Sequence, residues 1–350
     1  MSHFIESYLM KGKVRIIATA AMSLPLAAWG HVKWFVDFDT TKAPESVSQV
    51  TGSLDFWGLL LLSTVVIFFT SVLDRKVLSF TERPNFEALL KQSHSYIPVI
   101  MRWGTGIFFL TLGVFYPSVI LTPELIIENP WLKYVHFLIA FTAFSDKTSF
   151  VAGFGIIFLY SYAVQLYGTF HMLDYIIFIG TGVYLITRTF IPHREYAVAL
   201  ELLRFVLCYS FLWGAVEKFM QPDLFYQLLT DHSYLAMGLN WEFYVRACGF
   251  VELCLAWHIY TGKMAGYAGI AVLAIIVVLA FIPFGLTDFI GHFLFIIPLV
   301  AVLLTPRKKL LFRTAMVSTV AFLLMFFILM LFGYVSYYLL HFNLHPHLHP

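Results

Sequence analysis

Three side chains of the sequence combine a titratable group with a position inside a long apolar stretch. Glu252 stands in the middle of "GFVELCLAW", and Asp288 and His292 are four residues apart in "GLTDFIGHFLF". Residues at i and i+4 share one face of a helix, so Asp288 can orient and tune His292, or join it as a metal ligand. A carboxylate this deep in apolar sequence must be paired or protonated. We therefore predict that Glu252, Asp288 and His292 form a catalytic group that moves protons.

Structural roles are the alternatives for these residues. Glu252 can form a fixed ion pair with Arg204 or Arg246. Asp288 can cap the start of a helix, where the helix dipole favours a negative charge. In that case His292 is a packed polar residue, and both alternatives stay open.

Four further charged residues lie near the ends of apolar runs, and we predict that they bind a ligand. Arg102 and Arg204 can contact an anion or a lipid headgroup, or orient a redox ligand, and the alternative is snorkelling or pairing with a carboxylate such as Glu201. Glu217 and Lys218 are neighbours. Neighbours on a helix point about 100° apart, so one side chain is expected to face the bundle and the other to reach outward.

The C-terminal segment "HFNLHPHLHP" contains four histidines, His341, His345, His347 and His349. Clustered imidazoles in an extended segment bind copper, nickel or zinc. We predict a loose divalent-metal site here, because the spacing matches no closed tetrahedral site. The alternative is a tail without a specific role.

The composition shows which class of protein surrounds these residues. Of 350 residues, 60% are hydrophobic and 12% are charged, whereas soluble domains are about 25% charged. The mean hydropathy is +0.82. These values exclude an ordinary soluble or disordered protein. A net charge of +2 without a basic stripe excludes a nucleic-acid partner. None of the three cysteines forms a CxxC pair, so no disulfide framework is expected.

Eleven hydrophobic runs predict a polytopic bundle of about eleven transmembrane helices. Basic residues gather in alternate connections and acidic residues in the others. The positive-inside rule then places the N-terminus in the cytoplasm and the C-terminus in the periplasm, in a bacterial inner membrane. The runs begin near Arg15, Leu54, Ile97, Leu132, Thr148, His171, Ala197, Tyr244, Met264, Leu286 and Thr314.

An internal repeat is visible in the third to tenth runs. Arg102 and Arg204 open the third and seventh runs, and Asp174 and Asp288 open the sixth and tenth. We predict two parallel four-helix units, with a site at their interface. The predicted divisions are 1–95 (two helices and a cytoplasmic loop), 96–195 (first unit), 196–305 (second unit) and 306–350 (last helix and histidine-rich tail).

The second unit resembles the DoxX-like family of four-helix membrane proteins. The residues that carry the resemblance are Arg204, Gly214, Lys218, Pro222, Gly249, Glu252, Asp288 and His292. The first unit keeps the arginine and the aspartate but lacks the lysine and the histidine. The resemblance implies an association with membrane redox systems, such as thiosulfate:quinone or quinol-oxidising complexes, and with thiol stress.

The leading functional expectation is a membrane subunit of a quinone-linked redox system that binds a small or lipid-like ligand between helices. Whether the chain is itself an enzyme stays open. The cofactor is unknown, and the candidates are a quinone and a divalent metal at the histidine-rich tail. Its expected partners are the lipid bilayer and other membrane or periplasmic proteins. Two alternatives are a transporter for a metal ion or small solute, and a membrane scaffold without chemistry.

Overall fold

The computed structural model describes residues 32–36, 42–76, 84–191, 196–306 and 310–340. The predicted all-α class is confirmed, since these residues form helices with one isolated β-bridge, between Val119 and Ile126. Seven of the helices in the described part are long and apolar enough to cross a membrane. The chain is therefore a polytopic helical membrane protein.

The first predicted run falls within residues 1–31, outside the described residues. The described helices comprise those of the later runs, two of which share α14, and short helices that no run predicted. In chain order they are η1 (Val32–Trp34), α2 (Val47–Thr51), α3 (Leu54–Lys76), α5 (Pro84–His94), α6 (Ile97–Phe115), α7 (Leu132–Phe144), α8 (Ser149–Tyr167), α9 (Thr169–Met172), η2 (Leu173–Tyr175), α10 (Ile176–Phe190), α11 (Tyr196–Met220), α12 (Pro222–Asp231), η3 (Ser233–Ala236), α13 (Trp241–Thr261), α14 (Met264–Leu303) and α15 (Ala315–Leu340).

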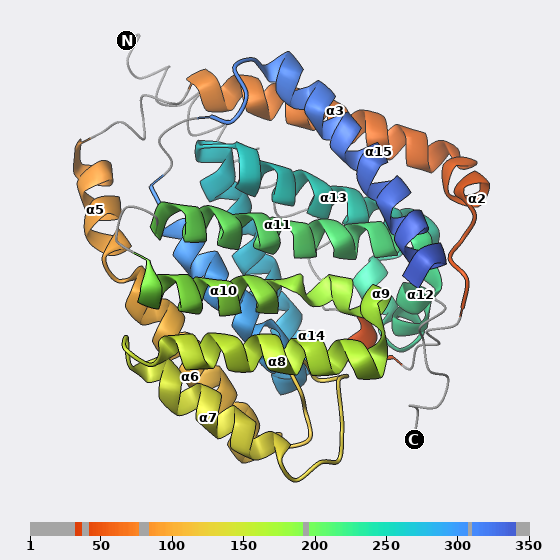
Figure 1. Ribbon diagram of the computed structural model, residues 1–350. Coiled ribbons are helices and arrows are strands. Elements are labelled where there is room, and N and C mark those ends of the chain that lie inside the picture. Colours follow the sequence, from red (N-terminus) through yellow and green to blue (C-terminus); the bar gives the residue numbers. More distant parts are fainter. Residues whose placement is uncertain (1–31, 37–41, 77–83, 192–195, 307–309, 341–350) are drawn as a thin grey trace.

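The long helices form one bundle in which neighbours along the chain mostly pack together (Figure 1). α6, α7, α8 and α10 pack in succession, α10 continues to α11, and α11 and α13 adjoin α14. α3 and α15 pack against each other at the edge opposite α6 and α7. The first predicted unit corresponds to α6–α10 and the second to α11–α14.

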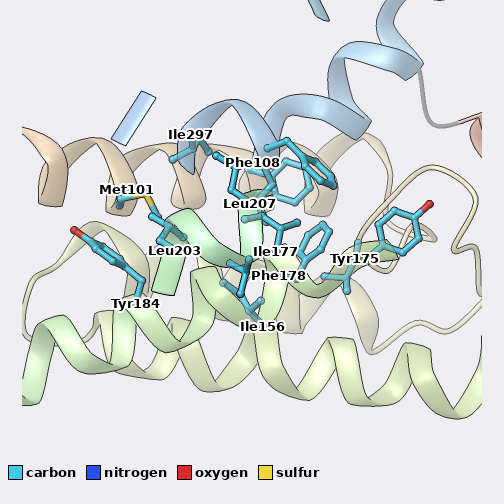
Figure 2. Close-up of a cluster of buried hydrophobic side chains, with 14 of the residues drawn as sticks. Met101, Phe108, Ile156, Tyr175, Ile177, Phe178, Tyr184, Leu203, Leu207 and Ile297 are labelled. Atoms are coloured by element: carbon cyan, nitrogen blue, oxygen red, sulfur yellow. The ribbon is translucent and has the colours of Figure 1, made fainter. Parts of the chain in front are cut away.

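Buried apolar side chains from several helices fill the centre of the bundle. Figure 2 shows Phe108 of α6, Ile156 of α8, Ile177 of α10 and Leu207 of α11 converging. The outward faces are also apolar, and Leu61, Ile282 and Leu331 are among the large exposed side chains. An apolar surface around an apolar core is what a lipid environment requires, because lipid tails are as apolar as the core.

α14 is broken inside its length. Gly285 has φ 65° and ψ −147°, which is outside the helical region, and glycine adopts such a conformation without steric cost. Pro283, two residues earlier, lacks the backbone N–H that would bond to Leu279. The break divides α14 into two half-helices, at the point where the sequence separates the runs beginning at Met264 and Leu286.

Two glycines bring α8 and α10 into close contact. A Cβ on Gly153 would lie 2.5 Å from the backbone oxygen of Gly182, and a Cβ on Gly182 would lie 2.9 Å from the backbone oxygen of Gly153. Small residues at such a crossing allow two membrane helices to pack by their backbones. This contact holds α10, and with it Asp174 of the preceding η2, against α8.

The close crossing predicts the effect of a larger side chain. Gly153→Val should separate α8 from α10 and lower the stability by about 1–3 kcal/mol, as overpacking does. The midpoint of thermal unfolding in detergent measures the loss. The control is Gly58→Ala on α3, where an added Cβ meets nothing within 4 Å. Equal midpoints for the two variants would contradict the close crossing.

Candidate functional site

Of the seven predicted site residues that the structure describes, five lie toward the end of the bundle that carries α12, which we call the α12 end. There the bundle buries charged and polar side chains in three groups, each held together by an ion pair. The members of this cluster are Lys33, Asp174, Glu217, Lys218, Glu252, Asp288 and His292, each at most 6% exposed. Charges inside an apolar bundle are costly, and so they mark functional positions by default.

Lys33 of η1 joins carboxylates from two parts of the bundle. Its Nζ lies 2.5 Å from Oε1 of Glu217 on α11 and 3.4 Å from Oδ2 of Asp174 in η2. Trp213 Nε1 donates to the same Glu217 oxygen at 3.1 Å. Burial alone lowers the pKa of Lys33, but the Glu217 and Asp174 carboxylates outweigh it and raise that pKa above its usual value. The Lys33 ammonium is therefore held charged between the two predicted units.

Trp34, which follows Lys33 in the chain, also connects the two predicted units. Its Nε1 donates to Tyr175 Oη at 3.2 Å, and its indole meets the His292 ring edge-on at a centroid distance of 4.8 Å. A Cβ on Gly291 would lie 2.2 Å from the indole, so only glycine admits Trp34 here. Lys33 and Trp34 together tie η2 to α11 and α14.

Lys218 and Glu252 form a buried ion pair between α11 and α13. Lys218 Nζ donates to both Glu252 oxygens, at 2.8 and 2.7 Å, and to the backbone oxygen of Gly214 at 3.4 Å. We expected one of the neighbours Glu217 and Lys218 to face the bundle and the other to reach outward. This expectation is wrong, because both residues are 4% exposed. Each finds an opposite charge on a different element, so neither has to reach outward.

A small cavity adjoins the Lys218 ammonium. Its polar wall consists of Lys218, Tyr244 and Cys248, and its apolar wall of Phe225, Leu228, Leu229 and Val245. The Tyr244 hydroxyl makes no hydrogen bond of ordinary geometry with a described residue, and the Cys248 thiol is its polar neighbour. The space is sufficient for about one water molecule. Such a water would connect the ion pair to the Tyr244 hydroxyl.

Asp288 and His292 lie side by side just after the break in α14. His292 Nδ1 is 3.1 Å from Asp288 Oδ1 and 3.1 Å from the backbone oxygen of Asp288. Both side chains are buried. The predicted contact between carboxylate and imidazole is therefore present in the structure, as the i, i+4 spacing requires.

A second pair of a carboxylate and an imidazole joins a loop to the bundle. The Glu124 side chain, between α6 and α7, is 5% exposed and lies with its Oε1 3.8 Å from His171 Nε2. His171 packs edge-on against Tyr175, the residue that accepts from Trp34. The first predicted unit thus also carries a carboxylate beside an imidazole.

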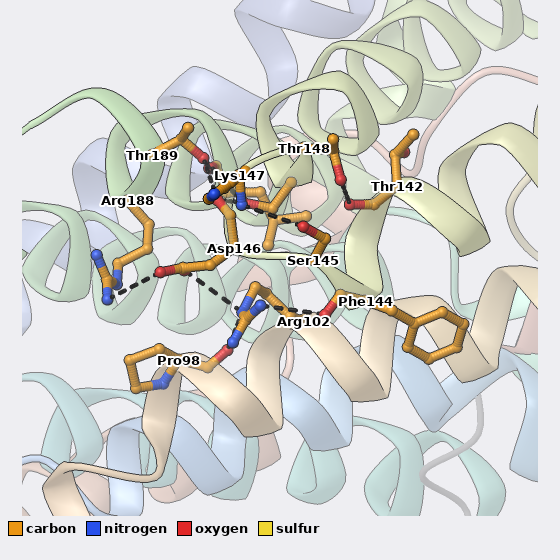
Figure 3. A network of polar contacts seen from close by, with 12 residues as sticks. Pro98, Arg102, Thr142, Phe144, Ser145, Asp146, Lys147, Thr148, Arg188 and Thr189 are labelled. Atoms are coloured by element: carbon orange, nitrogen blue, oxygen red, sulfur yellow. Dashed lines mark hydrogen bonds and ion pairs between the residues drawn. The ribbon is translucent and has the colours of Figure 1, made fainter.

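The two arginines predicted to bind a ligand lie apart from this cluster. Arg102 donates to the Phe144 backbone oxygen at 3.1 Å and pairs with Asp146, which also pairs with Arg188 (Figure 3). Arg204 Nη1 is 3.2 Å from Glu201, which is one of its two expected carboxylate partners. Arg102 therefore joins α6 to the turn between α7 and α8, and a ligand role for either arginine stays a prediction.

The expected metal ligands His341, His345, His347 and His349 lie outside the described residues. Within the described part of the chain, no group of three or more His, Cys, Asp or Glu residues could hold a metal ion.

Sequence reasoning missed Lys33 as a member of the cluster, and Trp34 and Tyr175 as residues that contact it. Lys33 follows the first apolar run, in a segment whose fold the hydropathy pattern does not determine. The available signal was a charged residue beside an aromatic one at the edge of a span. Such pairs are common at membrane interfaces, and so the signal alone does not indicate a buried contact.

Lys33 supplies a test of the buried contacts. Lys33→Met leaves the Glu217 and Asp174 carboxylates without their cation, which should cost about 3–5 kcal/mol. The midpoint of thermal unfolding in detergent measures the effect. The matched control is Lys42→Met, since Lys42 pairs with Asp223 at the surface with side chains 60% and 51% exposed, and an exposed pair contributes at most about 1 kcal/mol. Equal losses from both variants would refute the arrangement.

No protein-family model, curated protein or solved structure matches this chain. The DoxX-like resemblance therefore stays an expectation carried by the motif residues themselves. Four of these residues, Gly214, Lys218, Glu252 and Gly249, lie at the contact of α11 with α13. A Cβ added to Gly214 would lie 3.9 Å from a carboxylate oxygen of Glu252. A Cβ added to Gly249 would lie 3.2 Å from the backbone oxygen of Ala215, so the two helices pack closely there.

Proposed function

We propose that the protein is a membrane subunit of a quinone-linked redox system, in which the Lys218–Glu252 pair exchanges protons with a small lipid-like ligand. The observation that carries the proposal is this ion pair, with N–O distances of 2.7 and 2.8 Å, buried in an otherwise apolar bundle. Replacing such a pair by apolar residues is often neutral or stabilising. Its presence in the bundle interior is therefore better explained by chemistry than by stability.

The surroundings of the pair suit the exchange of a proton. The Lys218 ammonium carries protons, the Glu252 carboxylate accepts them, and the adjoining cavity has the Tyr244 hydroxyl on its wall. Converting a quinone to a quinol adds electrons together with protons. In our proposal an electron-donating partner subunit would supply two electrons, and the Lys218–Glu252 pair would relay two protons to the quinone from water at the periplasmic face.

The cavity also has an apolar wall, which the ring of a quinone would contact. That wall belongs mainly to α12, through Phe225, Leu228 and Leu229. The ring of Phe225 lies 4.7 Å from Lys218 Nζ. A ligand larger than water would take the place of these side chains and receive the hydrogen bonds of the ammonium.

The membrane topology is part of the proposal. We place eleven spans in a bacterial inner membrane, with the N-terminus in the cytoplasm and the two four-helix units at residues 96–195 and 196–305. Support comes from the second to eleventh runs, each of which corresponds to a helix or, for α14, to half of one. The α12 end then faces the periplasm, where a periplasmic partner would reach the site.

A transporter is the second candidate, and the break in α14 favours it. Discontinuous helices at the interface of two repeats are a recurrent feature of transport sites, since their free backbone groups bind ions. Gly285 interrupts α14 close to Asp288. In this case the same buried charges would couple the movement of a solute across the membrane to the movement of protons.

The test combines chemical analysis with a variant. Full-length protein purified from its host membranes should carry a quinone that mass spectrometry identifies. In those membranes Glu252→Gln should lower quinone-dependent electron transfer by about 10-fold or more, because general acid–base groups contribute at least that much. The control is Glu242→Gln, which changes an exposed carboxylate of the same helix. Full activity of Glu252→Gln together with absence of a bound quinone would rule the redox function out.

A further inference from the structure

Asp288 is buried without the hydrogen bonds that a buried carboxylate needs. It is 0% exposed, and neither of its carboxylate oxygens makes a hydrogen bond with a described residue. Its close polar neighbour is His292 Nδ1, at 3.1 Å from Oδ1. Leaving a buried acceptor unsatisfied costs free energy, and the cost rises when that acceptor is charged. The position therefore suits a positively charged ligand.

The charged side chains on the elements that pack against α14 already have partners of their own. Lys33 of η1 binds Glu217 and Asp174, Lys218 of α11 binds Glu252, and Arg246 of α13 binds Glu242. At the other end, Arg102 of α6 binds Asp146, and Asp74 of α3 accepts from the backbone N–H groups of Lys263 and Met264. None of these contacts places a protein cation on Asp288.

The broken helix adds a second and independent observation. Gly285 leaves the helical conformation three residues before Asp288, and Pro283 has no backbone N–H to bond to the oxygen of Leu279. The half-helix after Gly285 begins with Asp288 in its first turn. In broken membrane helices, unwound backbone carbonyls and the ends of half-helices coordinate small cations.

We propose that Asp288, together with His292, binds a monovalent cation at the break of α14, either a proton or a sodium ion. The site is separate from the Lys218–Glu252 pair and does not depend on the proposed redox function. A divalent transition metal fits less well, because the described residues include no group of three or more His, Cys, Asp or Glu ligands. A proton needs only the Asp288 oxygen and the imidazole nitrogen.

Trp34 connects the proposed cation site to other elements of the bundle. Its indole lies against His292 and Gly291 on α14 and donates to Tyr175 in η2. A change of charge at Asp288 and His292 therefore acts on a side chain that contacts both predicted units.

Cation-dependent stability of the full-length protein in detergent tests the proposal. A ligand that binds the folded chain raises its unfolding midpoint by mass action. Wild-type protein should gain a few degrees either on acidification of the buffer or on replacing choline chloride by sodium chloride. The first response identifies a proton and the second a sodium ion, and Asp288→Asn should abolish whichever occurs.

The controls separate the site from general effects on folding. Asp231→Asn, an exposed carboxylate at the end of α12, should keep the wild-type response. His292→Gln should reduce the response and serves as the second variant if Asp288→Asn does not fold. A response that is the same in wild-type protein, Asp288→Asn and His292→Gln, or one that is absent from wild-type protein, overturns the proposal.

Discussion

The cost of placing a charge in an apolar interior governs the arrangement of this bundle. Lys33 and Lys218 are buried, and each is held by carboxylates that come from other elements. Their positions therefore constrain which helices adjoin. α11 supplies Glu217 to η1 and Lys218 to α13, so two neighbouring residues hold the helix on two sides. Apolar packing alone is less selective, because lipid tails compete equally well for apolar side chains.

The same constraint connects structure with function. Ion pairs in the interior cost desolvation and are retained where their charges are used. Among the described residues, the α12 end buries a carboxylate beside a group that can carry a proton in four places, namely Lys33–Glu217, Lys218–Glu252, His292–Asp288 and His171–Glu124. Trp34 and Tyr175 lie between the last two. The α12 end thus concentrates the acid–base chemistry of the described residues, whereas the other end carries the arginine contacts that join turns and helices.

Hydropathy was sufficient to place the long helices, because long apolar runs have few alternatives to a membrane-spanning helix. The same pattern separated the two halves of α14, although Gly285 and not a polar loop divides them. The i, i+4 spacing predicted the contact of Asp288 with His292, which is local. Long-range partners could not be predicted this way. Glu252 has several cations within reach along the sequence, and it pairs with Lys218 and not with Arg204 or Arg246, because helix rotation decides which side chains meet. Lys33 was missed for the same reason, since its neighbours in the fold are far away in the sequence.

The Lys33 contact has a consequence for how the chain is assembled during synthesis. Lys33 is separated from Glu217 by 184 residues and from Asp174 by 141. A ribosome releases the chain from its N-terminal end onward, so the Lys33 ammonium emerges long before either carboxylate exists. Until α11 has entered the membrane, that ammonium has to remain in water or at the lipid headgroups, and the segment that carries it cannot take its final place. Insertion of α11 therefore becomes the step that allows η1 to close onto the bundle.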